Sequence, residues 1–171
     1  MNADIFRAYD IRGSYPSDLN EEIVYKIGAA LADKITINRK AVVAMDGRLS
    51  GPYIKKSLID GLVSHGIEVT DCGMLPTPML YFATKILNIP NGFMVTGSHN
   101  PKDYNGIKMI VGDNPLFDKD IYALRDWIAN NIIEEVGNND KPNISSDIAD
   151  KYIKRIKEDI SINLEDKFVI D

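Results

Sequence analysis

The chain has 171 residues, of which 44% are hydrophobic and 26% are charged, as is usual for a globular protein. Its 25 acidic residues outnumber its 20 basic ones, and the resulting formal charge of −5 argues against a nucleic-acid-binding surface. It has no apolar run of the roughly 20 residues that a membrane-spanning helix needs, no signal-peptide pattern, and no partner for its single Cys72. We therefore expect a cytoplasmic protein that binds neither nucleic acid nor membrane.

Helix and strand signals alternate along the first half of the chain. Asn20 can cap a helix that begins at Glu21. The apolar run at residues 41–45 is typical of a buried strand. Ser50, with Pro52 in the first turn, predicts a second helix that ends at Gly66, and a strand at residues 67–71 follows it.

The same alternation continues to about residue 130. Thr77 and Pro78 begin another predicted helix, and residues 92–96 and 107–111 are predicted strands. The segment between these two strands is too short for a helical crossover, so we expect them to pair antiparallel. Asp118 can cap a further helix. The pattern predicts an α/β fold in which helices cover both faces of a mixed sheet, a three-layer α/β/α sandwich.

Composition changes near residue 137 and suggests a second region. Residues 137–146 are rich in Gly, Asn, Lys, Pro and Ser, which is typical of a linker. Beyond them, Ile148, Tyr152, Ile156 and Ile160 recur every four residues and predict a helix with one apolar stripe. Residues 167–171 look like a strand. We therefore divide the chain into a domain at residues 1–136 and, at residues 137–171, a linker, an amphipathic helix and the first strand of a second domain.

The segment Thr96–Lys108 carries the strongest chemical signal. Ser98 lies beside His99, one of only two histidines, in a polar loop tightened by glycines and a proline, with Lys108 after an Asn-Gly pair that is typical of a turn. A hydroxyl on a constrained loop, near an imidazole and an ammonium, suits a nucleophile that accepts a phosphoryl group. The same residue types also form ordinary turns, so the residues alone leave both interpretations open.

Four segments, in the same order as in a known family, resolve this choice. Thr96–Lys108, with its Ser-His-Asn-Pro core, resembles the phosphoserine loop of the α-D-phosphohexomutases. Residues 6–13 (Phe-Arg-Ala-Tyr-Asp-Ile-Arg-Gly) resemble the N-terminal motif of the bacterial phosphomannomutase/phosphoglucomutase branch of that family. Residues 46–50 and 73–78 resemble two further segments of its first domain. The chain is thereby identified as similar to the N-terminal domain of such a mutase, and the resemblance implies a three-layer α/β/α fold.

The resemblance also implies a reaction and the residues that serve it. Family members interconvert hexose 6-phosphate and hexose 1-phosphate through a phosphoserine and a hexose 1,6-bisphosphate. By position, Ser98 would carry the phosphoryl group and Lys108 would supply charge. Tyr9, Arg12 and Asn100 would bind substrate or phosphate, although Tyr9 can equally serve only packing. Mg²⁺ is the implied cofactor, bound here only through the phosphate on Ser98, because the aspartate ligands of the family lie beyond residue 171.

Some roles stay open on the sequence. His99 suits general acid/base catalysis, because histidine side chains titrate near neutral pH, but it can equally hold the loop by hydrogen bonding. Arg48 is either an active-site cation or a structural partner of Asp46; Ala44 and Met45 stand where the family usually has Gly-Arg. Two functions are compatible with the chain: an N-terminal mutase fragment that acts with the remaining domains in cis and is inactive alone, or a stand-alone, non-catalytic phosphosugar-binding or regulatory domain.

Overall fold

The computed structural model of the protein describes residues 2–134 and 142–161. The helical elements are η1 (Ala3–Ile5), α1 (Glu21–Lys34), α2 (Gly51–Ser64), α3 (Thr77–Ile86), α4 (Lys119–Asn130) and α5 (Ile148–Asp159). The strands are β1 (Ile11–Ser14), β2 (Lys40–Met45), β3 (Glu68–Met74), β4 (Gly92–Val95), β5 (Tyr104–Val111), β6 (Asn114–Pro115) and β7 (Asn143–Ile144).

These strands form one mixed sheet in the order β1-β5-β4-β2-β3-β7, with β6 beside β5. β2 pairs parallel with both β3 and β4, as expected for strands that are joined through helices. β5 runs antiparallel to β4, which confirms the predicted pairing of these two strands. The carboxyl ends of β2 and β4 therefore lie together at one edge of the sheet.

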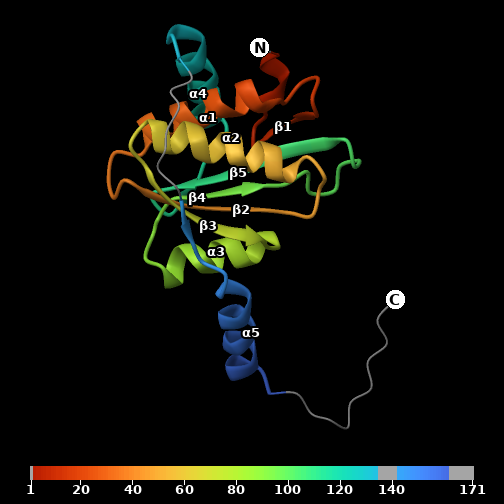
Figure 1. Ribbon diagram of the computed structural model, residues 1–171, viewed down its shortest axis with the longest axis vertical. Helices are drawn as coiled ribbons and strands as arrows, with labels where there is room; N and C mark the ends of the chain where they lie inside the picture. The colour runs from red at the N-terminus through yellow and green to blue at the C-terminus, as the bar shows by residue number, and fades with distance from the viewer. Residues whose placement is uncertain (1, 135–141, 162–171) are drawn as a thin grey trace.

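Helices cover both faces of the sheet, which confirms the predicted three layers. Helices α1, α2 and α4 lie on one face and α3 on the other (Figure 1). Alternate residues of a strand point to opposite faces: along β2, Val43 belongs to the larger core with α1 and α2, whereas Val42 belongs to the smaller core with α3. Burial of both strand faces explains the uninterrupted apolar runs of β2 and β4 in the sequence.

The predicted helix starts are correct, but only one of the three predicted caps forms. The side chain of Asn20 accepts a hydrogen bond from the backbone N–H of Ile23 at the start of α1. Ser50 and Asp118 occupy the cap positions of α2 and α4 without making a side-chain cap bond. The Ser50 hydroxyl instead accepts a 2.9 Å hydrogen bond from the buried amide of Asn105.

The predicted Asn-Gly turn is wrong, because Asn105 and Gly106 lie inside β5. This strand begins at Tyr104, three residues before the predicted start. It pairs antiparallel with β1, a strand that the periodicity did not predict. Asn105 is fully buried, and its amide is satisfied by Ser50, 55 residues away. Gly106 is required by close packing, since a Cβ there would overlap the carbonyl oxygen of Ile11.

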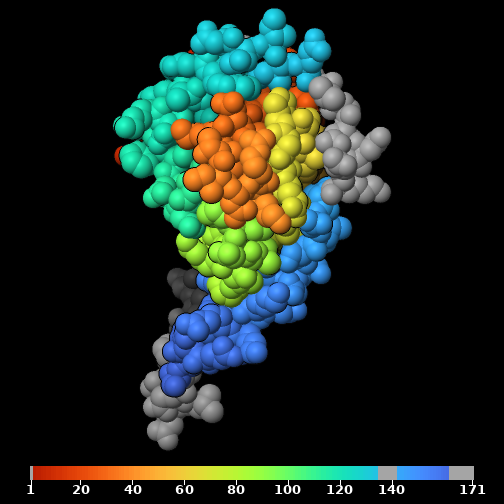
Figure 2. All heavy atoms as spheres, turned by 90° about the vertical axis from the view of Figure 1, so that its left-hand side faces the viewer, coloured from red at the N-terminus to blue at the C-terminus, as the bar shows by residue number. Residues whose placement is uncertain are grey.

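The C-terminal region differs in part from its prediction. Within the predicted linker, Asn143 and Ile144 form β7 and pair parallel with β3, while residues 137–141 lie outside the described residues. Helix α5 forms as predicted and extends away from the rest of the molecule (Figure 2). Its first apolar residue, Ile148, is buried against α3, whereas Ile156 and Ile160 are 40% and 57% exposed. The predicted strand at residues 167–171 lies outside the described residues.

Candidate active site

The loop that carries Ser98 begins where β2 and β4 end. Asp46 follows β2 directly, and Thr96 follows β4 at the start of the loop to β5. The backbone N–H of Asp46 donates to the carbonyl oxygen of Val95, so the two strand ends are tied together at 2.9 Å. Ligands of α/β proteins commonly bind beyond the carboxyl ends of parallel strands, and Ser98 and His99 are exposed there.

Ser98 has a backbone conformation that is unusual for its residue type. Its φ angle is 52°, in the left-handed region that non-glycine residues rarely adopt. The Ser98 N–H donates to the Thr96 hydroxyl at 2.9 Å, and the Thr96 hydroxyl in turn donates to Asp46 at 2.8 Å. The next turn is closed by Asn100, whose backbone N–H and side-chain amide both donate to the carbonyl of Gly97. Strained backbone that its surroundings hold in place is common at functional sites.

Two cations, one on β1 and one on β5, share a carboxylate, and the one on β1 contacts this loop. Arg12 lies opposite Gly106 in the register of the two strands, and Lys108 lies two residues further along β5, so both side chains leave the same face of the sheet. Both contact Asp10, with nitrogen–oxygen distances of 2.6 Å for Arg12 and 3.9 Å for Lys108. Arg12 also donates a long hydrogen bond, 3.4 Å, to the side chain of Asn100.

The buried carboxylate of Asp10 is a site component that the sequence reasoning missed. Its side chain is only 8% exposed, while those of Arg12 and Lys108 are 29% and 32% exposed. One carboxylate thus holds two partly exposed cations and leaves the group with a net positive charge. Such a group suits a doubly charged phosphate, for which the planar fork of arginine is well shaped. The sequence signal was the Asp-Ile-Arg spacing, which places both side chains on one face of an extended segment.

Tyr9 and His99 occupy exposed positions. Tyr9 is 79% exposed, so it does not pack into the core of the described residues. Among the described residues, the His99 imidazole has no hydrogen-bond partner, and this does not support the alternative that it holds the loop. Neither side chain makes a hydrogen bond or an ion pair within the part of the chain that the structure describes.

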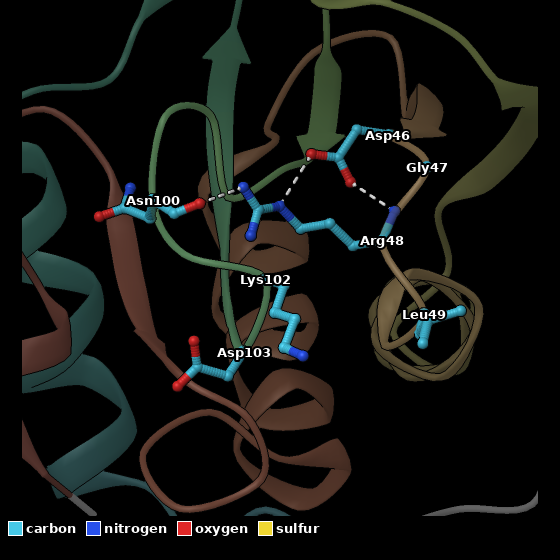
Figure 3. Close-up of a pocket in the computed structure, with 7 residues that line it drawn as sticks. All are labelled: Asp46, Gly47, Arg48, Leu49, Asn100, Lys102 and Asp103. Carbon is cyan, nitrogen blue, oxygen red and sulfur yellow. Dashed lines mark hydrogen bonds and ion pairs between the residues drawn. The ribbon is translucent and has the colours of Figure 1, made fainter.

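A hollow of about 670 Å³ adjoins the loop between β4 and β5 that carries Ser98 (residues 96–103, the serine loop) on the side of the β2–α2 connection. Its lining comes from both loops: Asp46, Gly47, Arg48, Leu49, Asn100, Lys102 and Asp103. Figure 3 shows Arg48 extending from the β2–α2 connection toward Asn100, with Asp46 beside its guanidinium. The Arg48 Nε lies 3.2 Å from the Asp46 carboxylate, which confirms the predicted structural pair.

Among residues 2–134 and 142–161, no group of three or more His, Cys, Asp or Glu is placed to hold a metal. Within the same ranges, no helix combines the length and the apolar character needed to cross a bilayer.

Comparison with known proteins assigns the chain to a family. Residues 3–135 match the model of phosphoglucomutase/phosphomannomutase, alpha/beta/alpha domain I. The whole chain is 44% identical to a phosphomannomutase/phosphoglucomutase of Pseudomonas aeruginosa, of which it covers 37%, and 98% of it is 39% identical to a phosphoglucomutase of Neisseria meningitidis, of which it also covers 37%. A solved phosphoglucomutase/phosphomannomutase family protein from Burkholderia thailandensis superposes with a TM-score of 0.83 at 36% identity, covering 94% of this chain and 36% of that one. The chain thus spans little more than a third of these relatives, and it belongs to the phosphoglucomutase/phosphomannomutase family through its domain I.

Proposed function

We propose that this chain is the phosphoryl-carrying domain of a phosphohexomutase, which interconverts hexose 6-phosphate and hexose 1-phosphate. The observation that carries the proposal is the setting of Ser98: an exposed serine whose backbone is held in the left-handed region, in a loop whose Asn100 side chain accepts a hydrogen bond from Arg12. Arg12 in turn shares the carboxylate of Asp10 with Lys108. Family membership of the domain supports the reaction class.

In the proposed cycle, phosphorylated Ser98 donates its phosphoryl group to the free hydroxyl of a hexose monophosphate. The bond from phosphorus to Ser98 Oγ breaks, a bond from phosphorus to the sugar oxygen forms, and the sugar hydroxyl releases its proton. The resulting hexose 1,6-bisphosphate reverses its orientation in the site and then returns the opposite phosphoryl group to Ser98. Such transfers depend mainly on in-line positioning and on neutralising phosphate charge.

The described residues have separate tasks in this cycle. A phosphate on Ser98 carries roughly −1.5 to −2 charges at neutral pH, and Arg12 and Lys108 are the cations that would offset them. Asp10 would keep both cations oriented, and Asn100 would keep Arg12 near the loop. His99, exposed next to Ser98, is our candidate for moving the hydroxyl proton, and Tyr9 for a hydrogen bond to the substrate.

We also propose Mg²⁺ as the cofactor, bound in part through this domain. A phosphate oxygen on Ser98 is a hard ligand of the kind that Mg²⁺ prefers, and the ion would supply charge neutralisation next to the transferred group. Since residues 2–134 and 142–161 hold no acidic cluster for a metal, the remaining ligands would come from the rest of a longer protein in cis.

Mapping the phosphate tests the proposal. A longer protein that contains this domain is incubated with glucose 1,6-bisphosphate, and the modified residue is identified by mass spectrometry. We expect phosphate on Ser98, and we expect Ser98→Ala to lose turnover by several orders of magnitude, because this substitution removes the hydroxyl that is proposed to carry the phosphoryl group. Phosphate on another residue, or undiminished turnover of Ser98→Ala, would contradict the proposal. Sugar-phosphate binding without any phosphoryl transfer would favour the non-catalytic alternative.

A further inference from the structure

All five N–H donors of the Arg48 guanidinium are occupied by the protein itself. Nε donates to the Asp46 carboxylate. One terminal nitrogen donates to the carbonyl oxygens of Pro101 and Tyr104, and the other to those of Ser98 and Asn100, at 3.1 and 2.8 Å. An arginine has five such hydrogens. Although Arg48 lines the hollow in Figure 3, it has no donor left for a phosphate oxygen.

The four carbonyls that Arg48 binds span the serine loop, from Ser98 to the first residue of β5. This segment has few hydrogen bonds of its own, and one side chain that is only 12% exposed ties it to the β2–α2 connection. Gly97 makes room for this arrangement, since a Cβ at that position would overlap the guanidinium. A lysine has three donors around one nitrogen and cannot reach the same set of carbonyls.

Asp46 holds the other side of Ser98. Its Oδ2 accepts hydrogen bonds from the Gly97 N–H at 3.2 Å and from the Thr96 hydroxyl at 2.8 Å. Because the Thr96 hydroxyl accepts the N–H of Ser98, the peptide groups on both sides of the Ser98 Cα are bound, the N–H through Asp46 and Thr96 and the carbonyl by Arg48. This double restraint explains how a serine keeps a φ angle of 52°.

We propose that Arg48, paired with Asp46, is a positioning residue that fixes the backbone of Ser98 for phosphoryl transfer and does not bind the substrate phosphate. The catalytic part of this inference rests on the proposed function. The restraint on the loop does not, because it follows from the hydrogen bonds alone. Its consequence is that loss of Arg48 slows the transfer step while substrate affinity changes little.

The restraint is measured on the 171-residue chain by amide hydrogen exchange. In Arg48→Ala we expect the amides of Gly97 and Ser98 to exchange roughly tenfold faster or more, while core amides such as that of Val43 keep their protection. Lys102→Ala is the matched control, since Lys102 lines the same hollow and makes no hydrogen bond or ion pair with the described residues. Unchanged exchange at Gly97 and Ser98 in Arg48→Ala would overturn the inference.

The catalytic consequence is measured in a longer protein that contains this domain. We expect Arg48→Ala to lower kcat by about 100-fold with little change in KM, as for a misplaced nucleophile. Arg48→Lys keeps the charge but not the donor geometry and should remain defective, whereas added guanidinium should restore part of the activity of Arg48→Ala. Full activity of Arg48→Lys, or a raised KM as the main effect, would mean that the charge binds substrate and would overturn the inference.

Two further outcomes separate this inference from the proposed function. If wild-type protein never acquires phosphate on Ser98, the proposed function fails, and the exchange result still decides whether Arg48 restrains the loop. If Arg48→Ala does not melt cooperatively, Thr96→Val replaces it, because this variant removes the link from Asp46 to the Ser98 N–H and leaves Arg48 in place. The Ser98 amide should exchange faster in this variant as well, and unchanged exchange would contradict the proposed restraint on the Ser98 backbone.

Discussion

At the scale of single residues, the site is a set of charges whose partners determine what each can do. Arg48 is saturated by backbone carbonyls and Asp46, whereas Arg12 and Lys108 share one buried carboxylate and stay partly exposed. Two cations on one carboxylate leave positive charge that an incoming phosphate can use. Residue type alone does not distinguish these arginines: each pairs with an aspartate two residues away, and their roles differ through partners 50 or more residues away in the sequence.

The two cations of this group should respond differently to mutation. Lys108→Ala leaves Asp10 with its 2.6 Å bond to Arg12, so we expect little change in stability. Arg12→Ala leaves the buried carboxylate with Lys108, at 3.9 Å, as its one charged partner among the described residues, and we expect a loss of roughly 1–3 kcal/mol in the free energy of unfolding. In a longer protein, Lys108→Ala should lower kcat on the order of 100-fold, more than it raises KM, if it neutralises charge in the transition state.

Urea unfolding and a coupled mutase assay check these expectations. Lys85→Ala is a suitable control, because Lys85 forms an exposed ion pair with Asp113 on a different part of the surface. Wild-type kinetics of both Lys108→Ala and Arg12→Ala would remove these cations from the proposed mechanism.

At the scale of secondary-structure elements, burial explains which parts the sequence predicts. The runs of β2 and β4 are apolar on both sides because both sheet faces are covered, and their strand character is visible without any partner. The edge strand β1 and the start of β5 contain Gly, Ser and Asn, which favour turns when considered locally. They become strands through pairing with each other and through the hydrogen bond from Asn105 to Ser50, and such long-range contacts are not encoded in local periodicity.

The contact between α1 and α2 depends on two glycines that face each other. A Cβ on Gly61 would overlap the carbonyl oxygen of Tyr25, and a Cβ on Gly28 would lie 2.6 Å from that of Leu58. Alanine favours a helix over glycine by about 1 kcal/mol, but here the overlap is with backbone that cannot move aside. We therefore expect Gly61→Ala to destabilise the domain by a net 1–3 kcal/mol, roughly the cost of overpacking a core.

Urea unfolding of Gly61→Ala against Gly47→Ala measures this effect. Gly47 is exposed, and an added Cβ would meet only the Met74 sulfur at 3.8 Å, so this control should stay within about 0.5 kcal/mol of wild type. Equal stability of the two variants would show that the helices can separate without cost.

At the scale of the whole molecule, the fold brings together segments that are distant in sequence. Residues 10–12, 46–48 and 96–108 meet because β1, β2, β4 and β5 are neighbours in one sheet. The sequence predicted the candidates Ser98, Arg12 and Lys108 through resemblance, and the layers through periodicity. The roles of Asp10 and Thr96 and the bonds from Arg48 to the backbone of the serine loop were not predicted, since each depends on a hydrogen-bond geometry that exists only after the sheet has formed.

The stability of the folded chain should also fall at alkaline pH for a reason that the structure supplies. Burial, with a smaller contribution from Asp71, raises the pKa of Cys72 from 9.0 to about 11. A hydrogen bond to Glu21 raises the pKa of Tyr15 from 10.0 to about 12.

In both cases the folded state favours the protonated form, so the unfolded chain loses these protons first as the pH rises. The stabilisation from Cys72 is lost as the pH rises from about 9 to about 11, and that from Tyr15 as the pH rises from about 10 to about 12. We expect the difference in unfolding free energy between wild type and Tyr15→Phe to be constant up to about pH 9.5 and to shrink above it. The corresponding difference between wild type and Cys72→Ala should begin to shrink about one pH unit lower. Urea titrations from pH 8 to about pH 11.5 measure both differences, and a difference that does not change with pH would show that the residue has the same pKa in both states.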